Sequence, residues 1–168
     1  MGKNKIYHYY VEGETEKKLI NILKTEYQII KSGKVEKFNI TIKKMKPNRV
    51  IPLKKGTIVV LVFDTDIENS SILDANIEFL EKQKNISEII CITQVNNLED
   101  ELKRSCKITE IKHLTGSMTN TEFKKDMLKQ SNLKKKLDDK CFDFSRFWIM
   151  SPKESFSHIE NEAKKIKL

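Results

Sequence analysis

Cysteines are few and long apolar segments are missing, and both absences narrow what this protein can be. Its 3 cysteines are odd in number and widely spaced along 168 residues. That spacing argues against a disulfide scaffold and against a zinc site, and it favours thiols in a reducing cytoplasm. No apolar run approaches the roughly 18 residues that a membrane-spanning helix needs. The basic N-terminus is followed by a run too short and too polar for a signal peptide. We therefore expect a cytoplasmic protein without a membrane segment.

Internal repeats, low-complexity tracts and clear linkers are also missing from the sequence. A chain of 168 residues with 38% apolar and 33% charged residues is about one globular domain long. We expect a core over residues 1–105 and a helical C-terminal extension over residues 106–168 that packs on the same domain.

The net charge of +8 is unevenly distributed along the chain. Residues 1–56 hold 14 Lys/Arg and 5 Asp/Glu, residues 57–100 hold 2 and 9, and residues 101–168 hold 16 and 10. An acidic middle between basic flanks fits a cation site within a surface that binds a polyanion such as nucleic acid. Solvated lysine-rich helix faces would give the same totals, so the charge alone leaves both interpretations open.

The first half of the chain alternates between strand-like and helix-like patterns. Residues 6–11 are aromatic and β-branched and predict a strand, and residues 14–30 carry apolar positions at helical spacing. Residues 38–42 alternate as a second strand would. Residues 43–55 are basic, contain two prolines and predict a loop.

The middle of the chain gives the strongest strand signal. Residues 57–63 are apolar without alternation, as in the central strand of a parallel sheet. A helix over residues 69–83 and a further strand over residues 88–93 follow. This order predicts an α/β fold, with a mostly parallel, doubly wound sheet flanked by helices and joined by right-handed crossovers.

The last third of the chain reads as mainly helical. Residues 142–150 form an aromatic patch around Trp148, which we expect to pack the extension onto the sheet. The helices expected in this part cover residues 97–104, 119–129, 132–138 and 155–167.

Two short acidic motifs come directly after two of the predicted strands. Glu12 follows the first strand, and Asp64 and Asp66 follow the strongest one. Ligands of open parallel sheets bind at the carboxyl ends of the strands, so these three carboxylates converge if the two strands are parallel neighbours. Carboxylates gathered there would raise one another's pKa values. A divalent cation removes that repulsion, and an oxygen-only ligand set favours Mg²⁺ or Mn²⁺ over zinc.

Individual acids in these motifs could also stabilise helices rather than bind a cation. An aspartate at a strand end often caps the following helix, although capping accounts less readily for a pair two residues apart. Glu14 and Glu16 fall in a first helical turn, where the helix dipole favours acids. Of these two, Glu16 is the one we expect to have a functional role.

The two motifs together resemble the Toprim domain, the fold shared by topoisomerases, bacterial primases, small ribosomal-RNA maturation nucleases and OLD-family nucleases. Residues 11–16 read Val-Glu-Gly-Glu-Thr-Glu and residues 62–66 read Val-Phe-Asp-Thr-Asp. The first motif is most similar to the OLD-type and RloB-like branch, often found in phage-defence and mobile loci. The resemblance spans residues 5 to about 105. Each motif alone is weakly specific, but the pair with a strand and helix between them is more so.

The resemblance implies roles for individual residues. Glu12 corresponds to the glutamate that acts as general acid/base or second-metal ligand in the family. Asp64 and Asp66 correspond to the Asp-x-Asp pair that binds Mg²⁺, and Glu16 to an additional acid of the nuclease branch.

Residues 97–101 lie where the family carries a further acidic stretch near the metals. Glu99 is the expected contributor from this stretch. Lys103 and Arg104 follow it and are candidates for contact with a scissile phosphate. Further lysines are expected to contact a phosphate backbone; they lie at positions 43–44, 54–55, 124–125 and 134–136.

Departures from the family narrow the activity that we expect. The chain lacks the zinc-binding region of primases and the separate nucleophilic-tyrosine domain of topoisomerases, and Tyr7, Tyr9 and Tyr10 lie inside a predicted strand. Hydrolysis of phosphodiester bonds in DNA or RNA remains. The chain also lacks the ATPase domain of OLD-type nucleases, so we expect a separately encoded ATPase or self-association.

Two other functions stay open at this point. A haloacid-dehalogenase-like phosphatase also uses Asp-x-Asp after a buried strand, but there the motif comes near the N-terminus. Such enzymes usually carry Thr or Val where this chain has Glu68. A non-catalytic nucleic-acid-binding or regulatory subunit could keep the same fold.

Overall fold

A four-stranded, all-parallel sheet forms the centre of the protein, in a Rossmann-like arrangement. The computed structural model describes residues 4–168, so residues 1–3 of the predicted core lie outside the described part. The strands lie in the order β2-β1-β3-β4. Their bounds are β1 Ile6–Val11, β2 Gly33–Lys37, β3 Thr57–Asp64 and β4 Ile86–Gln94. The predicted α/β class and parallel sheet are confirmed.

β3 occupies the interior of the sheet and is buried along its whole length. It pairs with β1 from Ile6↔Thr57 to Val11↔Val62, and with β4 up to Asp64↔Gln94. A strand covered on both faces needs apolar side chains in both directions, which explains its unbroken apolar run.

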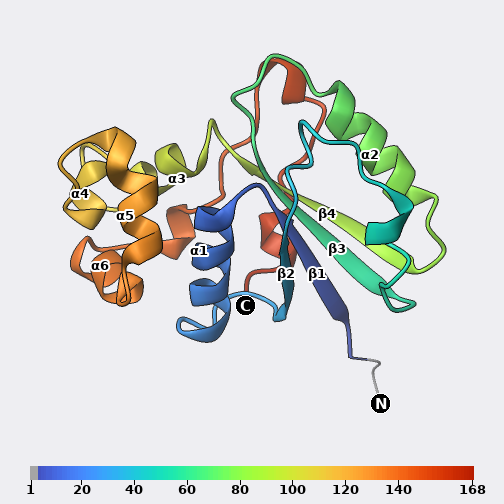
Figure 1. Cartoon of the computed structure of the whole chain (residues 1–168), viewed down its shortest axis with the longest axis horizontal. Helices are drawn as coiled ribbons and strands as arrows, with labels where there is room; N and C mark the ends of the chain where they lie inside the picture. The colour runs from blue at the N-terminus through green and yellow to red at the C-terminus, as the bar shows by residue number, and fades with distance from the viewer. Residues whose placement is uncertain (1–3) are drawn as a thin grey trace.

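Helices cover both faces of the sheet. α1 (Glu14–Thr25) packs Leu19 and Leu23 in one cluster with Tyr9. α2 (Ser71–Glu81) packs Leu73 and Leu80 in a second cluster with Tyr10. Because Tyr9 and Tyr10 are adjacent on β1, they point to opposite faces. Figure 1 accordingly shows the sheet lying between α1 and α2.

The C-terminal helices gather beside α1 (Figure 1). Aromatic residues 142–148 pack against the cluster of α1, and the ring centroids of Phe147 and Trp148 lie 4.5 Å apart. Of the helices in residues 4–168, none has the length and apolar character of a membrane span. The helices here are α3 Leu98–Ser105, α4 Lys112–Thr115, α5 Phe123–Lys129 and α6 Leu133–Asp139. Short 3₁₀ turns cover Pro47–Arg49, Asn120–Glu122, Phe144–Arg146, Glu154–Phe156 and Ala163–Lys165.

The second strand lies five residues earlier than the alternation of residues 38–42 predicts. Residues 39–43 form a turn in which Asn39 Oδ1 accepts hydrogen bonds from Thr41 N and Oγ1. The alternation reflects the burial of Phe38 and Ile40 beside the α2 face instead. In the actual strand, a Cβ at Gly33 would lie 2.4 Å from Tyr7 O. Glycine therefore allows β2 to approach β1 closely there.

The first predicted helix is too long, and the last one does not form. α1 ends at Thr25, and Gln28 has a φ of 55°, a left-handed conformation that cannot continue a helix. The predicted helix over residues 155–167 is absent; this tail forms 3₁₀ turns and runs along β4. There Glu162 N donates to Cys91 O at 2.8 Å, and its carboxylate accepts from Cys91 N at 3.1 Å. These bonds cover the free edge of β4. The local sequence of the tail gives no indication that it pairs with this strand.

The loop between β2 and β3 is fixed to α2 by one buried side chain. Asn76 Oδ1 accepts a hydrogen bond from Met45 N at 2.7 Å. Its Nδ2 donates to Ile40 O at 2.8 Å and to Lys43 O at 2.7 Å. Asn76 therefore satisfies three backbone groups of an irregular segment.

We expect Asn76→Ala to lower the free energy of unfolding by roughly 2–4 kcal/mol, because it leaves buried backbone groups without partners. Urea unfolding followed by circular dichroism measures this change. Asn132→Ala, an exposed asparagine, is the control and should cost much less. A loss at Asn76 no larger than at Asn132 would contradict the anchoring role of Asn76.

Candidate metal centre

Glu12 and Asp64 meet at the carboxyl edge of the sheet. Glu12 directly follows β1 and Asp64 ends β3, and these two strands are parallel neighbours. The Asp64 amide N donates a hydrogen bond to Glu12 Oε2 at 3.1 Å. The Asp64 side chain is buried, with 6% of its residue surface exposed. The predicted convergence of these two acids is therefore present in the fold.

Gln94 holds the Asp64 carboxylate from the opposite neighbour. It ends β4 in register with Asp64, and its Nε2 donates to Asp64 Oδ1 at 2.7 Å. Its Oε1 accepts from Trp148 Nε1 at 3.3 Å, which fixes the orientation of the amide. Sequence reasoning missed this residue. The sequence feature that could have indicated it is a polar residue at the end of an apolar strand; the pairing with Asp64 is visible only in the structure.

The first turn of α1 separates two glutamates with different environments. Glu16 is 3% exposed, and its Oε2 accepts a hydrogen bond from Thr15 Oγ1 at 3.0 Å. Gly13 leaves room for this carboxylate, since a Cβ there would lie 3.0 Å from Glu16 Oε2. Glu14 is exposed and pairs with Lys37 at 3.1 Å. Only Glu16 of these two is buried beside the sheet edge.

Asp66 and Glu99 lie at the rim of this carboxylate group. Asp66 is exposed and accepts a hydrogen bond from Asn97 Nδ2 at 3.4 Å. Glu99, in the first turn of α3, forms an ion pair of 3.3 Å with Lys124. Both acids are thus more accessible than the buried Glu16 and Asp64.

Burial and neighbouring carboxylates make Asp64 and Glu12 hard to ionise. Burial raises the pKa of Asp64 to about 9, and the charges of Glu12 and Glu16 act in the same direction. The pKa of Glu12 is raised by burial and, less strongly, by Glu16 and Asp66, although the Asp64 N–H and Lys124 oppose the shift. A positive charge at this edge would therefore be strongly favoured.

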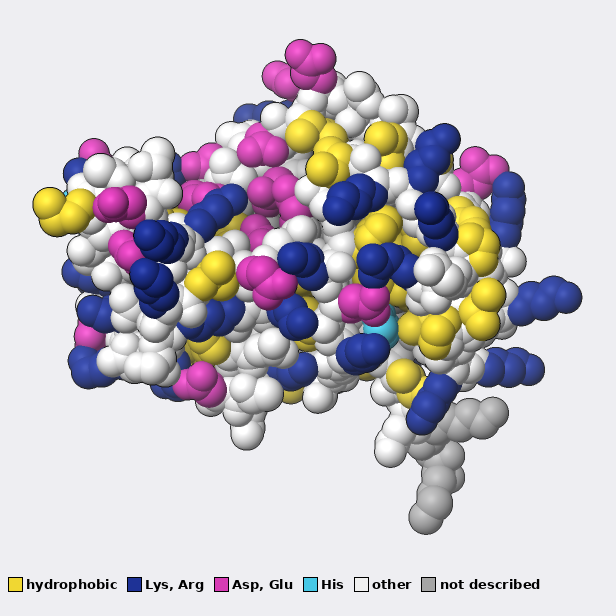
Figure 2. All heavy atoms as spheres, viewed as in Figure 1, with side chains coloured by type: hydrophobic (Ala, Val, Ile, Leu, Met, Phe, Trp, Pro, Cys, Tyr) yellow, Lys and Arg dark blue, Asp and Glu magenta, His cyan; other side chains and the backbone are white. Residues whose placement is uncertain are grey.

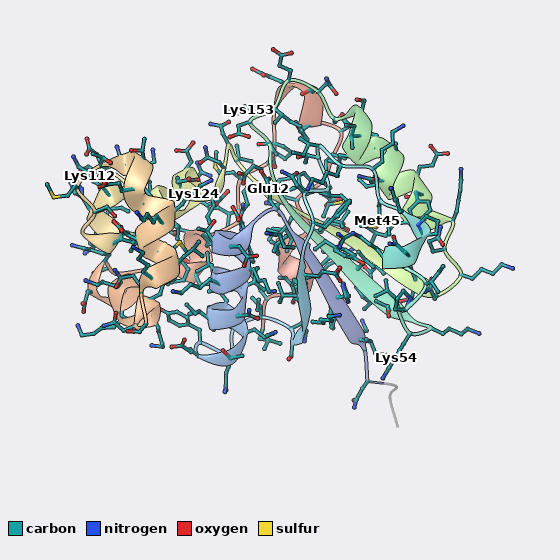
Figure 3. The ribbon with its side chains drawn as sticks, viewed as in Figure 1. Glu12, Met45, Lys54, Lys112, Lys124 and Lys153 are labelled. Atoms are coloured by element: carbon teal, nitrogen blue, oxygen red, sulfur yellow. The ribbon has the colours of Figure 1, made fainter. Side chains whose placement is uncertain are left out.

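Lys124 of α5 is a cation that the C-terminal extension brings to these acids. Burial alone would lower its pKa, but the carboxylates of Glu99, Glu16 and Asp64 outweigh this effect and raise it. Figure 3 shows it beside Glu12. The sequence placed Lys124 only among general surface lysines, because nothing local indicates that α5 packs against α1.

Two other predicted phosphate contacts have partners within α3 or beside it. Lys103 forms an ion pair with Asp100 at 2.8 Å. Arg104 pairs with Glu101 at 2.8 Å and donates to the Val95 carbonyl. The carboxylate of Glu101 is fully buried and also accepts from backbone amides. Arg104 is therefore part of a structural network.

The oxygen donors fit Mg²⁺ chemically, but they are not gathered into a ready ligand shell. Within residues 4–168, no three acidic, histidine or cysteine side chains are arranged to hold a metal ion. Each carboxylate instead accepts a hydrogen bond from its own donor: Glu12 from Asp64 N, Asp64 from Gln94, Glu16 from Thr15 and Asp66 from Asn97. Figure 2 shows acidic side chains gathered near the middle of this face with Lys and Arg on both sides. Metal binding here would require side-chain rotations that bring the carboxylates closer together, and each carboxylate that accepts one of these hydrogen bonds keeps further lone pairs for a cation.

No protein-family model, curated protein or solved structure matches the chain. Interpretation of the site thus depends on its own geometry and charge. The strongest of these features are the paired strand ends and the inner carboxylates with raised pKa values.

We expect Asp64→Asn to stabilise the metal-free protein at alkaline pH. Asp64 has an ordinary pKa of 3.8 and a folded value of about 9, so the folded state binds more protons between these values. Its stabilising contribution is fully present below about pH 4 and is lost as the pH rises toward 9. In EDTA at pH 8 the variant should gain at least about 1 kcal/mol, and less at pH 5.

Urea unfolding at the two pH values measures this difference. Asp139→Asn, at the exposed end of α6, is the control and should show no gain that grows with pH. Equal stability of Asp64→Asn and the unsubstituted protein at pH 8 would mean that Asp64 is ionised without cost.

Proposed function

We propose that this protein is a Mg²⁺-dependent (or Mn²⁺-dependent) nuclease of the Toprim type, which hydrolyses phosphodiester bonds in DNA or RNA. The observation that carries the proposal is the meeting of Glu12 and Asp64 at the ends of two parallel, adjacent strands. The motifs around these two residues resemble the OLD-type and RloB-like branch. The Rossmann-like sheet supports this assignment.

The carboxylates of Glu12, Glu16, Asp64 and Asp66 would hold the metal, with Glu99 contributing at the rim. Mg²⁺ bound there would neutralise charge on the phosphodiester and promote attack by water. Gln94 keeps the Asp64 carboxylate turned toward the edge through its 2.7 Å hydrogen bond. Lys124 supplies a positive charge on the side of α5, where a phosphate oxygen could pair with it.

The resemblance also bears on partners and setting. OLD-type nucleases combine the nuclease with an ATPase, so the partners we propose are an ATPase subunit or a second copy of this chain. Phage defence or a mobile element is the setting that the resemblance favours.

We expect cleavage of labelled nucleic acid in Mg²⁺ or Mn²⁺ to require the inner acids. Glu12→Gln and Asp64→Asn should each lower the rate at least about 100-fold, because each removes a charged oxygen ligand. Glu14→Gln, two residues after Glu12, is the matched control, since Glu14 is exposed and pairs with Lys37; it should keep its rate. The measurement is gel analysis of end-labelled DNA and RNA.

The outcomes of this experiment separate the competing functions. Cleavage that survives both inner substitutions would place catalysis elsewhere. A covalent aspartyl-phosphate on Asp64 would favour a phosphatase of the haloacid-dehalogenase type. Nucleic-acid binding in EDTA with no cleavage under any metal, with or without an ATPase partner, would favour a non-catalytic subunit.

Metal binding can be measured without any activity. Mg²⁺ should raise the melting temperature of the unsubstituted protein at pH 8, because a ligand of the folded state stabilises it by mass action. The doubly substituted Asp64→Asn/Asp66→Asn protein should lose this Mg²⁺-dependent rise, whereas Glu14→Gln should retain it. An equal rise in all three proteins would indicate that Mg²⁺ binds elsewhere.

A further inference from the structure

The loop between β2 and β3 carries an unusual concentration of positive charge. Residues 38–56, which we call the basic loop, contain 6 Lys/Arg and no Asp/Glu. Within the described residues 4–168, Arg49 pairs with Glu36 at 2.6 Å, whereas none of the loop lysines forms an ion pair. These lysines, at positions 43, 44, 46, 54 and 55, are all exposed.

Two of the three lysines in the α6 run, at positions 134 and 135, differ in this respect. Lys134 and Lys135 on α6 pair with Asp138 and Asp139 at 2.7 Å each, and Lys124 pairs with Glu99. Charge that is already paired attracts a polyanion less than charge that is free. The basic loop is therefore a better candidate for a binding surface than the lysine run of α6.

The backbone of the basic loop is fixed by hydrogen bonds from two asparagine side chains. Asn76 fixes residues 40–45 through three hydrogen bonds, and Asn85 Nδ2 donates to Val50 O at 2.7 Å and to Leu53 O at 3.0 Å. Met45 and Val50 are buried between these anchors. A fixed backbone lowers the entropy that is lost when the loop binds a partner.

Two cavities adjoin along this loop. One of about 480 Å³ is lined by Phe38, Lys43, Lys44, Lys46, Asn48 and Arg49. The other, of about 710 Å³, shares Asn48 and Arg49 and adds Lys34 and Lys54. Among the described residues that line the two cavities, Glu36 is the only acid. Its carboxylate is taken up by Arg49 and by His8 at 3.1 Å.

Arg49 joins the two cavities and is itself well fixed. Its guanidinium lies 4.6 Å from the centroid of the Phe38 ring, and its carbonyl accepts a hydrogen bond from Tyr10 OH at 3.0 Å. An arginine that is stacked and paired on one side can still donate N–H groups to a phosphate on the other. It thus provides a fixed centre between the exposed lysines of the loop.

The basic loop leads directly to the acidic edge. Phe38 N donates to Val11 O at 2.8 Å, so the loop begins beside the residue that precedes Glu12. Its other end, at Lys54, lies at the amino end of β3, as Figure 3 shows. β3 has 8 residues and spans about 26 Å at a rise of about 3.3 Å per residue. The length matches a chain of several phosphates better than one small anion.

We propose that the basic loop binds the phosphate backbone of a nucleic-acid strand and directs it to the carboxyl edge of the sheet. The class of partner rests on the proposed function, but the binding itself requires neither a metal nor cleavage. Spaced, unpaired lysines around a fixed arginine follow a backbone without reading its sequence. Lys43, Lys44 and Lys46, which lie in the half of the loop nearer to Glu12, should contribute most.

The test is fluorescence anisotropy of labelled single-stranded DNA and RNA of about 20 nucleotides, in EDTA over a range of salt concentrations. Lys43→Gln/Lys44→Gln/Lys46→Gln should weaken binding at least about tenfold at 0.1 M salt and reduce the slope of log K against log salt by about 2. The matched control, Lys134→Gln/Lys135→Gln/Lys136→Gln, removes the same charge from α6. It should change the affinity less than about twofold. Melting temperatures check that both proteins are folded.

Equal loss of affinity in the two triple variants would overturn the proposal, because only total charge would then matter. Unchanged affinity in the loop variant would overturn it as well. Binding of the unsubstituted protein to phosphatidylserine vesicles but not to either oligonucleotide would assign the loop to a lipid surface instead. Because all arms are in EDTA, absence of nuclease activity leaves this result intact. Conversely, cleavage that is lost in Glu12→Gln but unchanged in the loop triple variant would support the proposed nuclease function and reject the basic loop as the nucleic-acid binding surface.

Discussion

The parallel pairing of β1 with β3 is the constraint on which the rest of the structure depends. Both strands are buried along almost their whole length, so packing fixes their relative position without help from the acids. The register ends at Val11↔Val62, and the chain then places Glu12 within hydrogen-bonding distance of the Asp64 amide. The apolar sheet thus holds together two acidic residues that would separate if they lay on flexible loops.

Burying Glu12, Glu16 and Asp64 next to one another lowers the stability of the fold when they are ionised. Nearby donors and one lysine offset part of this loss. Neutral donors reach Asp64 and Glu16, and Lys124 adds a positive charge from α5. Lys18 of α1 in turn donates to the carbonyls of Met127, Leu128 and Gln130 near the end of α5. Carbonyls at a helix C-terminus attract a cation, so Lys18 ties α5 to α1. The C-terminal extension is therefore coupled to the acidic edge and not only to the apolar core.

Local sequence patterns were sufficient to predict the elements whose side chains are buried in a regular pattern. The unbroken apolar run of β3, the helix α2 and the acids that follow β1 and β3 were all readable, because burial on two faces leaves a strong signal. The position of β2 was not, since Phe38 and Ile40 are buried in a turn that imitates strand alternation. The tail along β4 and the approach of Lys124 to the acids depend on contacts between segments far apart in sequence. A single sequence carries no local trace of such contacts.

The sheet also accounts for the separation of acidic and basic residues along the chain, because the acids follow β1 and β3 whereas the lysines lie in the loop after β2 and on α5. Carboxylates that attract a metal ion also repel the phosphates of a nucleic acid. Binding of both therefore requires positive side chains that lie near the acids without forming ion pairs with them. The loop after β2 leaves the sheet beside Glu12, and Asn76 keeps its lysines on the α2 face. Lys124 approaches from α5, on the α1 side of the sheet. The acids are thus confined to the strand ends while cations occupy both flanks. Under the proposed function, a polyanion would be attracted from either side and a divalent cation would bind at the acidic edge between them.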